Sequence, residues 1–404
     1  MGAARKPPVA QRGALAWLRQ NLFSSWGNAV ASVLSAAVLA TFGFELLRWV
    51  LLEAHWGPVW ANLKLFAVYR YPPALLWRPF AGAALVMLLL GATAGVGERQ
   101  GESIAGGVFW WFLGLTTLLT LIGILAWPVV RWGWLALTLA GVAGYVAGRL
   151  RPALVRALPW SWGASLIVIV VLLGGFGDGG AMRSVSTKEW GGFMLTLILS
   201  VVGIAISFPL GIALALGRRS DLPVIKAVCV GFIEVVRGAP LIMWLFIASL
   251  MVPLVLNVSP SAVGPLTRAM VAVTLFSSAY MAENVRGGLQ AVPKGQYEAA
   301  QALGLSGWQR TRLIVLPQAL RAVIPAIVGQ AIALFKDTSL VFIVGLFDFF
   351  NVGNIVANQN ESLLIPGGVR LELSLFMAVV YWFFAYRMSV ASRQLERRLG
   401  VGER

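Results

Sequence analysis

Long runs of apolar residues, separated by short polar or basic segments, dominate this sequence. A helix that crosses a membrane needs about 20 consecutive, mostly apolar residues. We expect ten runs to form such spanning helices: 27–52, 79–97, 105–127, 132–148, 160–176, 190–216, 239–256, 267–285, 322–347 and 371–388. A shorter apolar stretch, 222–236, is closely flanked by charge and is expected to form an interfacial or elbow helix. The pattern predicts an all-α polytopic membrane protein with about ten transmembrane helices.

A polar segment at residues 177–189 divides these runs into two groups of five. We therefore expect an N-terminal membrane extension at 1–185 with about five spans, a second membrane part at 186–395, and a tail at 396–404. The first run is too long for the apolar region of a signal peptide and should remain as a helix. Gly144 and Gly148 have the spacing that lets membrane helices pack closely.

Composition supports the membrane class and narrows the chemistry. Hydrophobic residues make up 59% of the 404 residues and charged residues only 12%, which is about half the charged share of a soluble domain. His55 is the only histidine and Cys229 the only cysteine. These two residues are too few for a disulfide framework, a Cys/His metal site or a catalytic relay. We expect no metal site and no catalytic residues in this chain.

The net charge of +16 comes from 32 Lys and Arg against 16 Asp and Glu. In a soluble chain such an excess would suggest nucleic-acid binding. In a membrane protein, Lys and Arg instead concentrate in the cytoplasmic loops. Placing the N-terminus inside puts most of the basic residues on the cytoplasmic side of the ten expected spans. We therefore expect both termini in the cytoplasm and no nucleic-acid partner.

One long loop, residues 286–321, carries most of the functional information. Glu298, Ala299 and Ala300 lie in an alanine-rich segment that favours a helix. Gly304 is the expected C-terminal cap of that helix, and Pro317 is expected to break the chain before the next one. Such a segment could be a simple surface helix between two spans. It could also dock into a groove on a cytoplasmic partner, where small residues permit close approach.

The residues of this loop resemble the EAA loop of binding-protein-dependent ABC importer permeases. The matching positions are Glu298, Ala299, Ala300, Gly304, Ile314, Leu316 and Pro317. Three further segments resemble polar amino acid permeases of the histidine/glutamine type: FIEVVRGAPL at 232–241, AYMAENVRGGL at 279–289 and LFKDTSL at 334–340. The length, the extra N-terminal spans and LGRRS at 216–220 resemble the longer subunit of general L-amino acid importers and of glutamate/glutamine/aspartate/asparagine importers. The resemblance covers about residues 186–395 and is looser before them.

The resemblance implies a five-helix permease core of the type I ABC importer class at 186–395. The chain would form the translocation path of an ATP-driven L-amino acid importer in the bacterial inner membrane. The loop would couple it to an ATPase. No phosphate-binding G-x-x-x-x-G-K-[ST] motif occurs in the sequence, so no cofactor is expected here and a partner ATPase would bind ATP and Mg²⁺. The implied partners are a second, dissimilar permease, two ATPase subunits and a periplasmic amino-acid-binding protein, which would contact 257–266 and 348–368.

Charged residues within membrane spans are costly and often functional. Lys336 and Asp337 lie deep in the ninth run, with Gln330 before them. Together, a Lys and an Asp could meet both charges of a zwitterionic amino acid in the translocation path. Alternatively, the two residues pair with a neighbouring helix for structural reasons.

Two further charged pairs stand three residues apart on expected helices. Glu234 and Arg237 are expected to form an intrahelical structural pair. Glu283 and Arg286 repeat the spacing at the start of the long loop. Glu283 is either an anchor of that loop or a candidate for the translocation path.

Two other functional classes remain to be weighed against the importer. A self-contained secondary transporter driven by an ion gradient would not need the EAA loop. A membrane-embedded enzyme would need a cluster of nucleophile, base or metal ligands, which one histidine and one cysteine do not supply.

Overall fold

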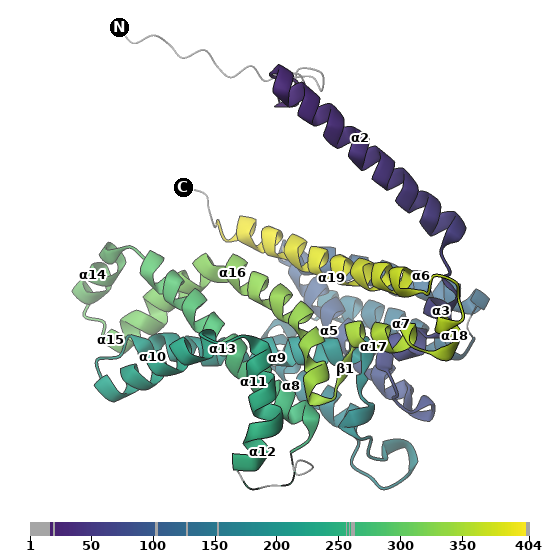
Figure 1. The fold of residues 1–404 in the computed structure, drawn as a ribbon. Helices are drawn as coiled ribbons and strands as arrows, with labels where there is room; N and C mark the ends of the chain where they lie inside the picture. Colours follow the sequence, from purple (N-terminus) through teal and green to yellow (C-terminus); the bar gives the residue numbers. More distant parts are fainter. Residues whose placement is uncertain are drawn as a thin grey trace. The chain divides into compact units, whose positions relative to one another are not determined.

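The computed structural model describes residues 17–18, 21–101, 104–126, 128–151, 153–255, 257, 259 and 263–400. Nearly all of them are helical (Figure 1). The chain divides into two compact units, Met1–Pro58 and Val59–Arg404. The expected division at residue 185 into an extension and a core stays a prediction. The basic residues at the start of the sequence lie outside the described residues. Residues 401–404 of the expected tail lie outside them as well.

The first unit contains the helix α2 (Trp26–Arg48), which continues as a π-helical turn, η1 (Trp49–Glu53). Ser25 caps the start of α2 by accepting a hydrogen bond from the backbone N–H of Asn28 at 3.2 Å. The helix corresponds to the expected span 27–52, and none of its side chains is buried. An apolar helix without a buried face is suited to a lipid environment.

Four long helices begin the second unit: α5 (Trp77–Arg99), α6 (Ile104–Ala126), α7 (Pro128–Leu150) and α8 (Leu154–Gly174). α5 and α7 pack with their backbones almost in contact. A Cβ atom at Gly91 or Gly95 would collide with the main chain of α7, and one at Gly144 or Gly148 with that of α5. The expected packing role of Gly144 and Gly148 is therefore confirmed.

The helices that follow make up the second membrane part. They are α9 (Gly192–Arg218), α10 (Pro223–Arg237), α11 (Leu241–Phe246), η5 (Ile247–Met251), α12 (Val252–Val255), α13 (Pro265–Ala291), α16 (Leu316–Asp337), η7 (Thr338–Val344), α17 (Phe349–Ala357), α18 (Asn360–Leu363) and α19 (Arg370–Arg398). The helix α13 is central, because α9, α10, α11 and α16 all pack against it. Its buried positions include Ala269, Ala272, Ala279 and Ala282. Small side chains here allow the helices to approach closely.

The expected elbow helix is confirmed as α10, which meets the segment from α11 to α12 at an angle of 105°. The break falls at Gly238–Pro240, where Pro240 precedes the first residue of α11. A proline has no N–H to continue the ladder of the preceding helix, so the chain turns there.

Seven helices among the described residues are long and apolar enough to cross a membrane, or eight if the bent pair forms one span. The expected spans 105–127 and 267–285 also form helices, α6 and α13, of 23 and 27 residues. These two are not among the helices that are long and apolar enough, but each of the ten expected runs coincides with helical segments. The chain is an all-α, multi-pass membrane protein.

Two sets of contacts tie the helices before the polar segment 177–189 to the later helices and to the segment itself. The buried Phe66 of α4 (Leu63–Val68) lies edge-on against Phe349 and Phe376, with ring centroids 5.5 and 5.0 Å away. The guanidinium of Arg78 is fully buried and donates hydrogen bonds to the backbone carbonyls of Ala181 (2.7 Å) and Arg183 (2.8 Å). A buried arginine is tolerated here because backbone carbonyls satisfy its donors.

The close contact between α5 and α7 makes a test of this packing possible. We expect Gly148→Ala to lower the free energy of unfolding by about 1–3 kcal/mol, because the added methyl group forces the two backbones apart. The change can be measured by denaturant titration of the purified protein in detergent. Gly114→Ala is the control, since a Cβ at this helical position meets no atom within 4 Å. Equal stability of the two variants would contradict the backbone contact.

Candidate coupling loop and charged sites

The long loop folds as a helix, a tight turn and a second helix, as the sequence predicts. α14 (Lys294–Ala302) comes first, and after the turn come α15 (Gly307–Gln309) and the π-helical turn η6 (Arg310–Val315). Gly304 has a φ of 74°, a left-handed conformation that glycine adopts at no steric cost. The N–H of Leu305 donates to the carbonyl of Ala300 (3.2 Å), and the N–H of Gly304 to that of Gln301 (2.9 Å). This Schellman pattern confirms Gly304 as the helix cap.

The loop presents both polar and apolar groups on its surface. Glu298 and Ala299 are exposed, whereas Ala300 is buried against the rest of the loop. Leu303 and Trp308 have 78% and 65% of their surface exposed. Figure 1 shows α14 and α15 at one end of the unit, beyond α10, α13 and α16. Exposed apolar side chains on a loop at the end of the unit are typical of a docking surface.

The expected break at Pro317 is wrong. The chain is one continuous helical segment from Gly307 to Val344, and Pro317 lies in the first turn of α16. The π-helical turn η6 comes directly before it. Carbonyls in a π-helix bond one residue further along the chain, so the ring and the missing N–H of Pro317 are accommodated without a break. The loop is therefore joined to the ninth expected span by an uninterrupted helix.

Tyr297, which the sequence analysis did not single out, holds the loop against the core. Its hydroxyl donates to the backbone carbonyl of Leu289 on α13 at 3.1 Å and accepts from Arg219 Nη1 on α9 at 3.3 Å. The guanidinium groups of Arg219 and Arg310 lie over its ring, 5.8 and 5.9 Å from the centroid. In the sequence, only its position next to Glu298 could have indicated a role for this tyrosine in the loop. This tyrosine connects α14 to α9 and α13.

Glu283 is the centre of a cluster of arginines, which we call the Glu283 hub. Its carboxylate accepts two hydrogen bonds of 2.8 Å from Arg286 and one of 3.0 Å from Arg218. Arg237 Nη1 lies 3.5 Å from it. These contacts join α9, α10 and α13 directly before the loop. Glu283 and Arg286 do interact at the expected spacing, but the carboxylate also serves two other helices.

Glu234 and Arg237 have different partners from the one expected. Glu234 Oε1 lies 2.9 Å from Arg218 Nη1, while Arg237 turns to Glu283 and places its guanidinium 5.5 Å from the ring centroid of Tyr280. The expected pair within α10 is replaced by contacts between helices. The physical reason is that one carboxylate in the hub can serve several donors, and a guanidinium offers five N–H groups.

Lys336 and Asp337 are the last two residues of α16. Lys336 is exposed in this single chain and Asp337 is half-buried. Within the described residues neither forms a salt bridge with another helix, which is what the structural alternative would need. Exposed residues recur along α16 every three or four positions and so share one face: Ala322, Ala326, Gly329, Ala333 and Lys336. Gln330 stands beside this face and is half-buried.

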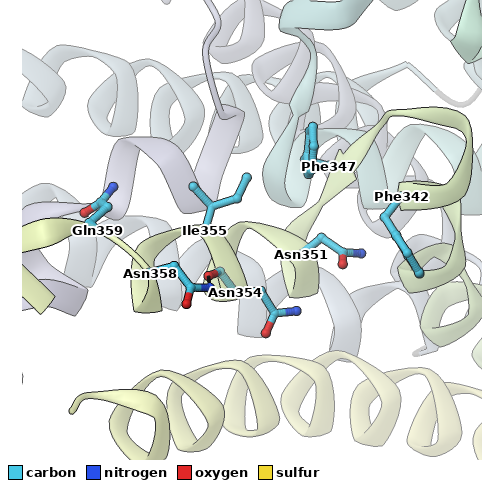
Figure 2. A pocket seen from close by; sticks show the side chains of 7 residues that line it. All are labelled: Phe342, Phe347, Asn351, Asn354, Ile355, Asn358 and Gln359. Carbon is cyan, nitrogen blue, oxygen red and sulfur yellow. Dashed lines mark hydrogen bonds between the residues drawn. The ribbon is translucent and has the colours of Figure 1, made fainter. Parts of the chain in front are cut away.

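A shallow pocket of about 460 Å³ lies between η7 and α17 (Figure 2). Its lining combines carboxamides with apolar side chains: Phe342, Phe347, Asn351, Asn354, Ile355, Asn358 and Gln359. The buried carboxylate of Asp348 caps α17 and accepts a 3.1 Å hydrogen bond from the hydroxyl of Tyr381. The side-chain amide of Asn351 donates a 2.7 Å hydrogen bond to the carboxylate of Asp348, which fixes the orientation of Asn351 in the pocket wall. Sequence reasoning missed this arrangement, although it lies in the segment 348–368.

In the other segment expected to meet a binding protein, 257–266, residues 258 and 260–262 lie outside the described residues. No group of three or more His, Cys, Asp or Glu in the described part of the chain has the geometry of a metal site.

Helical spans, an elbow helix and an exposed loop at one end of the unit define a membrane permease component. Over residues 207–401 the chain matches the family described as "Binding-protein-dependent transport system inner membrane component". It is 39% identical to the inner membrane amino-acid ABC transporter permease protein YhdY of Escherichia coli K12, over 96% of this chain and 94% of that protein. The chain therefore belongs to this family of inner membrane transport components.

Two further relatives differ in how much of the chain they match. The glutamate/glutamine/aspartate/asparagine transport system permease protein BztC of Rhodobacter capsulatus is 36% identical over 99% of this chain and 96% of its own length. The glutamate/aspartate import permease protein GltK of Escherichia coli O6:H1 is also 36% identical, but over 51% of this chain and 91% of its own length. The expected resemblance to the longer permease subunits is thus confirmed, and it covers the N-terminal half of the chain as well.

The Glu283 hub yields a test of stability. We expect Glu283→Gln to lower the free energy of unfolding by about 1.5–3 kcal/mol, because the neutral amide leaves three neighbouring guanidinium groups without their shared anion. Denaturant titration in detergent measures the change. Glu234→Gln is the matched control, since its side chain is 55% exposed and its pair should contribute about 0–1 kcal/mol. A larger loss in the control would show that Glu283 is not the centre of the hub.

Proposed function

We propose that this chain is the transmembrane permease subunit of an ATP-driven, binding-protein-dependent importer of L-amino acids. The observation that carries this proposal is the exposed helix–turn–helix loop with the EAA residues, placed at the end of a membrane core. The relatives YhdY, BztC and GltK are named as permeases for amino acids, among them glutamate and aspartate, which supports amino acids as the substrate class. The chain itself is a transport component and not an enzyme.

The loop 286–321 would couple transport to ATP hydrolysis on a separate subunit. Glu298, Ala299 and Gly304 would enter a groove of that ATPase, while Ile314, Leu316 and Pro317 would form the base of the helix behind them. Small residues on the docking face permit close approach, and the exposed Leu303 and Trp308 supply apolar area. The ATPase would bind ATP and Mg²⁺, because this sequence contains no phosphate-binding loop motif.

The exposed face of α16 would line the translocation path. It is made of small residues and ends at Lys336, and an unpaired cation within a span faces water or a protein cavity rather than lipid. Lys336 and Asp337 would supply opposite charges for the carboxylate and ammonium groups of the substrate, and Gln330 would supply a neutral donor and acceptor. Successive helical side chains diverge by about 100°, so the second permease would complete the contact to one of the two charges.

The orientation and the assembly follow from the same proposal. Both termini would lie in the cytoplasm of a bacterium, with the loop 286–321 on the same side. A second, dissimilar permease, two ATPase subunits and a periplasmic binding protein would complete the importer. The pocket on α17 lies in the segment proposed to meet the binding protein.

The cap of the coupling helix gives a test of the docking role. We expect Gly304→Ala to lower substrate uptake at least tenfold while leaving insertion and unfolding of the membrane part unchanged. The reason is that a residue with a Cβ is strained at a φ of 74° and shifts the docking face. Uptake in proteoliposomes and ATPase activity of the full complex measure coupling. Gly295→Ala is the control, since this glycine of the same loop has open space around it. Normal uptake by Gly304→Ala would count against docking through this turn.

The proposed path can be tested separately from coupling. We expect the double variant Lys336→Met/Asp337→Asn to lose at least nine-tenths of substrate uptake and of substrate-stimulated ATPase activity, because the charges that meet the zwitterion are gone. The control Lys226→Met/Asp221→Asn removes one positive and one negative charge from exposed positions. Lys226 lies on α10 and Asp221 lies just before this helix. Normal uptake and normal stimulation in the first variant would remove the pair from the path. Uptake without any ATPase subunit would instead favour a secondary transporter.

A further inference from the structure

Four arginines gather at one corner of the extension, where α5 and α7 end and α8 begins. Arg99 is the last residue of α5, Arg149 lies at the end of α7, and Arg151 and Arg156 follow in the turn and the first part of α8. All four side chains are exposed. We call this surface the arginine corner.

The fold builds this corner by packing two helix ends closely together. Gly95 on α5 lies directly against the backbone of Tyr145 and Arg149 on α7. One turn further along α5, Arg99 Nη1 donates a 2.8 Å hydrogen bond to the backbone carbonyl of Arg149. The guanidinium of Arg99 is thereby held against the end of α7, where Arg149 and Arg151 add two further positive charges, and like charges at one site favour binding of an anion.

The acidic side chain that precedes Arg99 in the sequence, Glu98, forms its hydrogen bonds with neutral side chains. Glu98 accepts a 2.6 Å hydrogen bond from the hydroxyl of Tyr145 and a 2.9 Å hydrogen bond from Nε1 of Trp110. Arg149 lies over the same tyrosine, 5.7 Å from the ring centroid. Among the described residues, no carboxylate forms a salt bridge with any of the four arginines.

Exposed apolar side chains adjoin the arginine corner along α7 and α8 and indicate what kind of anion fits it. Leu150 is 73% exposed, Val155 is 41% exposed and Trp160 is 82% exposed. Exposed tryptophans favour the level of the lipid headgroups, and exposed aliphatic groups beside them suit acyl chains. The arginines alone would also suit an acidic soluble protein, but the exposed tryptophan and aliphatic side chains beside them favour a lipid.

We propose that the arginine corner binds the headgroup of an anionic phospholipid of the inner leaflet. Guanidinium groups recognise phosphate oxygens through paired, charge-assisted hydrogen bonds. Clusters of basic residues between membrane helices on the cytoplasmic side suit such headgroups. The bound lipid would neutralise the corner and stabilise the helices of the extension against each other. The inference rests on the cytoplasmic orientation proposed above.

The test uses the purified full-length chain and cardiolipin as the probe. Native mass spectrometry from detergent micelles with added cardiolipin gives the affinity of the bound lipid. We expect Arg151→Gln/Arg156→Gln to weaken cardiolipin binding about 25-fold, at roughly fivefold for each arginine. Neither arginine has a carboxylate partner in the described structure, so the variant should fold normally. This assay requires no ATPase and no transport, so its failure leaves the proposed importer function untouched.

The control is Arg393→Gln/Arg397→Gln, which removes two exposed arginines from the end of α19. It should leave the tightest cardiolipin binding unchanged. An equal loss in the two double variants would reduce the effect to general charge and overturn the proposal. Retention of phosphatidylcholine as strongly as cardiolipin would overturn it as well, because a neutral headgroup does not need the arginines. Displacement of cardiolipin by an equal concentration of inorganic phosphate would show that the adjoining apolar side chains contribute nothing, and would also overturn it.

Discussion

Within a bilayer every backbone N–H and C=O group must find a hydrogen-bond partner inside the protein, because lipid offers none. The rest of this structure depends on that constraint, and it explains why the described chain is almost wholly helical. In the second membrane part, three helical segments change their pitch without opening the helix. These are the π-helical turns η5 and η6 and the 3₁₀ segment η7. Two of the three, η6 and η7, lie at the two ends of α16, next to the proposed coupling loop and the proposed path.

A second constraint follows, since apolar side chains gain little by leaving lipid for another apolar surface. Membrane helices associate through close packing and interhelical hydrogen bonds instead. The glycines between α5 and α7 and the alanines of α13 serve the first need. Polar contacts serve the second: the buried Arg78 joins the polar segment 177–189 to the extension, and the partly exposed Glu283 hub joins three helices of the core. Each polar contact is used where separate parts of the chain must be held in one geometry.

The sequence allowed the spans, the elbow helix and the cap at Gly304 to be predicted, because hydrophobic run length and backbone preference are local properties. The contacts of Glu234 and Arg237 could not be predicted in the same way. Their spacing on one helix was correct, but their partners come from α9 and α13. The roles of Tyr297, Arg78 and Asp348 were missed for the same reason, because each is defined by a contact far away in the sequence. Pro317 shows a third case, in which a strong local signal is overridden by a π-helical turn that sequence patterns do not reveal.

The continuity of the chain through Pro317 matters for the proposed mechanism. The helical segment Gly307–Val344 contains both Trp308 in the coupling loop and Lys336 in the proposed path, roughly 40 Å apart at 1.5 Å per residue. The backbone is helical throughout this segment, although η6 and Pro325 lie within it, so a displacement of the loop would be passed along α16 toward Lys336. The other end of the loop leads into α13, which packs against α16 and carries the Glu283 hub. A docked ATPase would therefore move two packed helices together, and a rigid-body change of access is what such an arrangement can deliver.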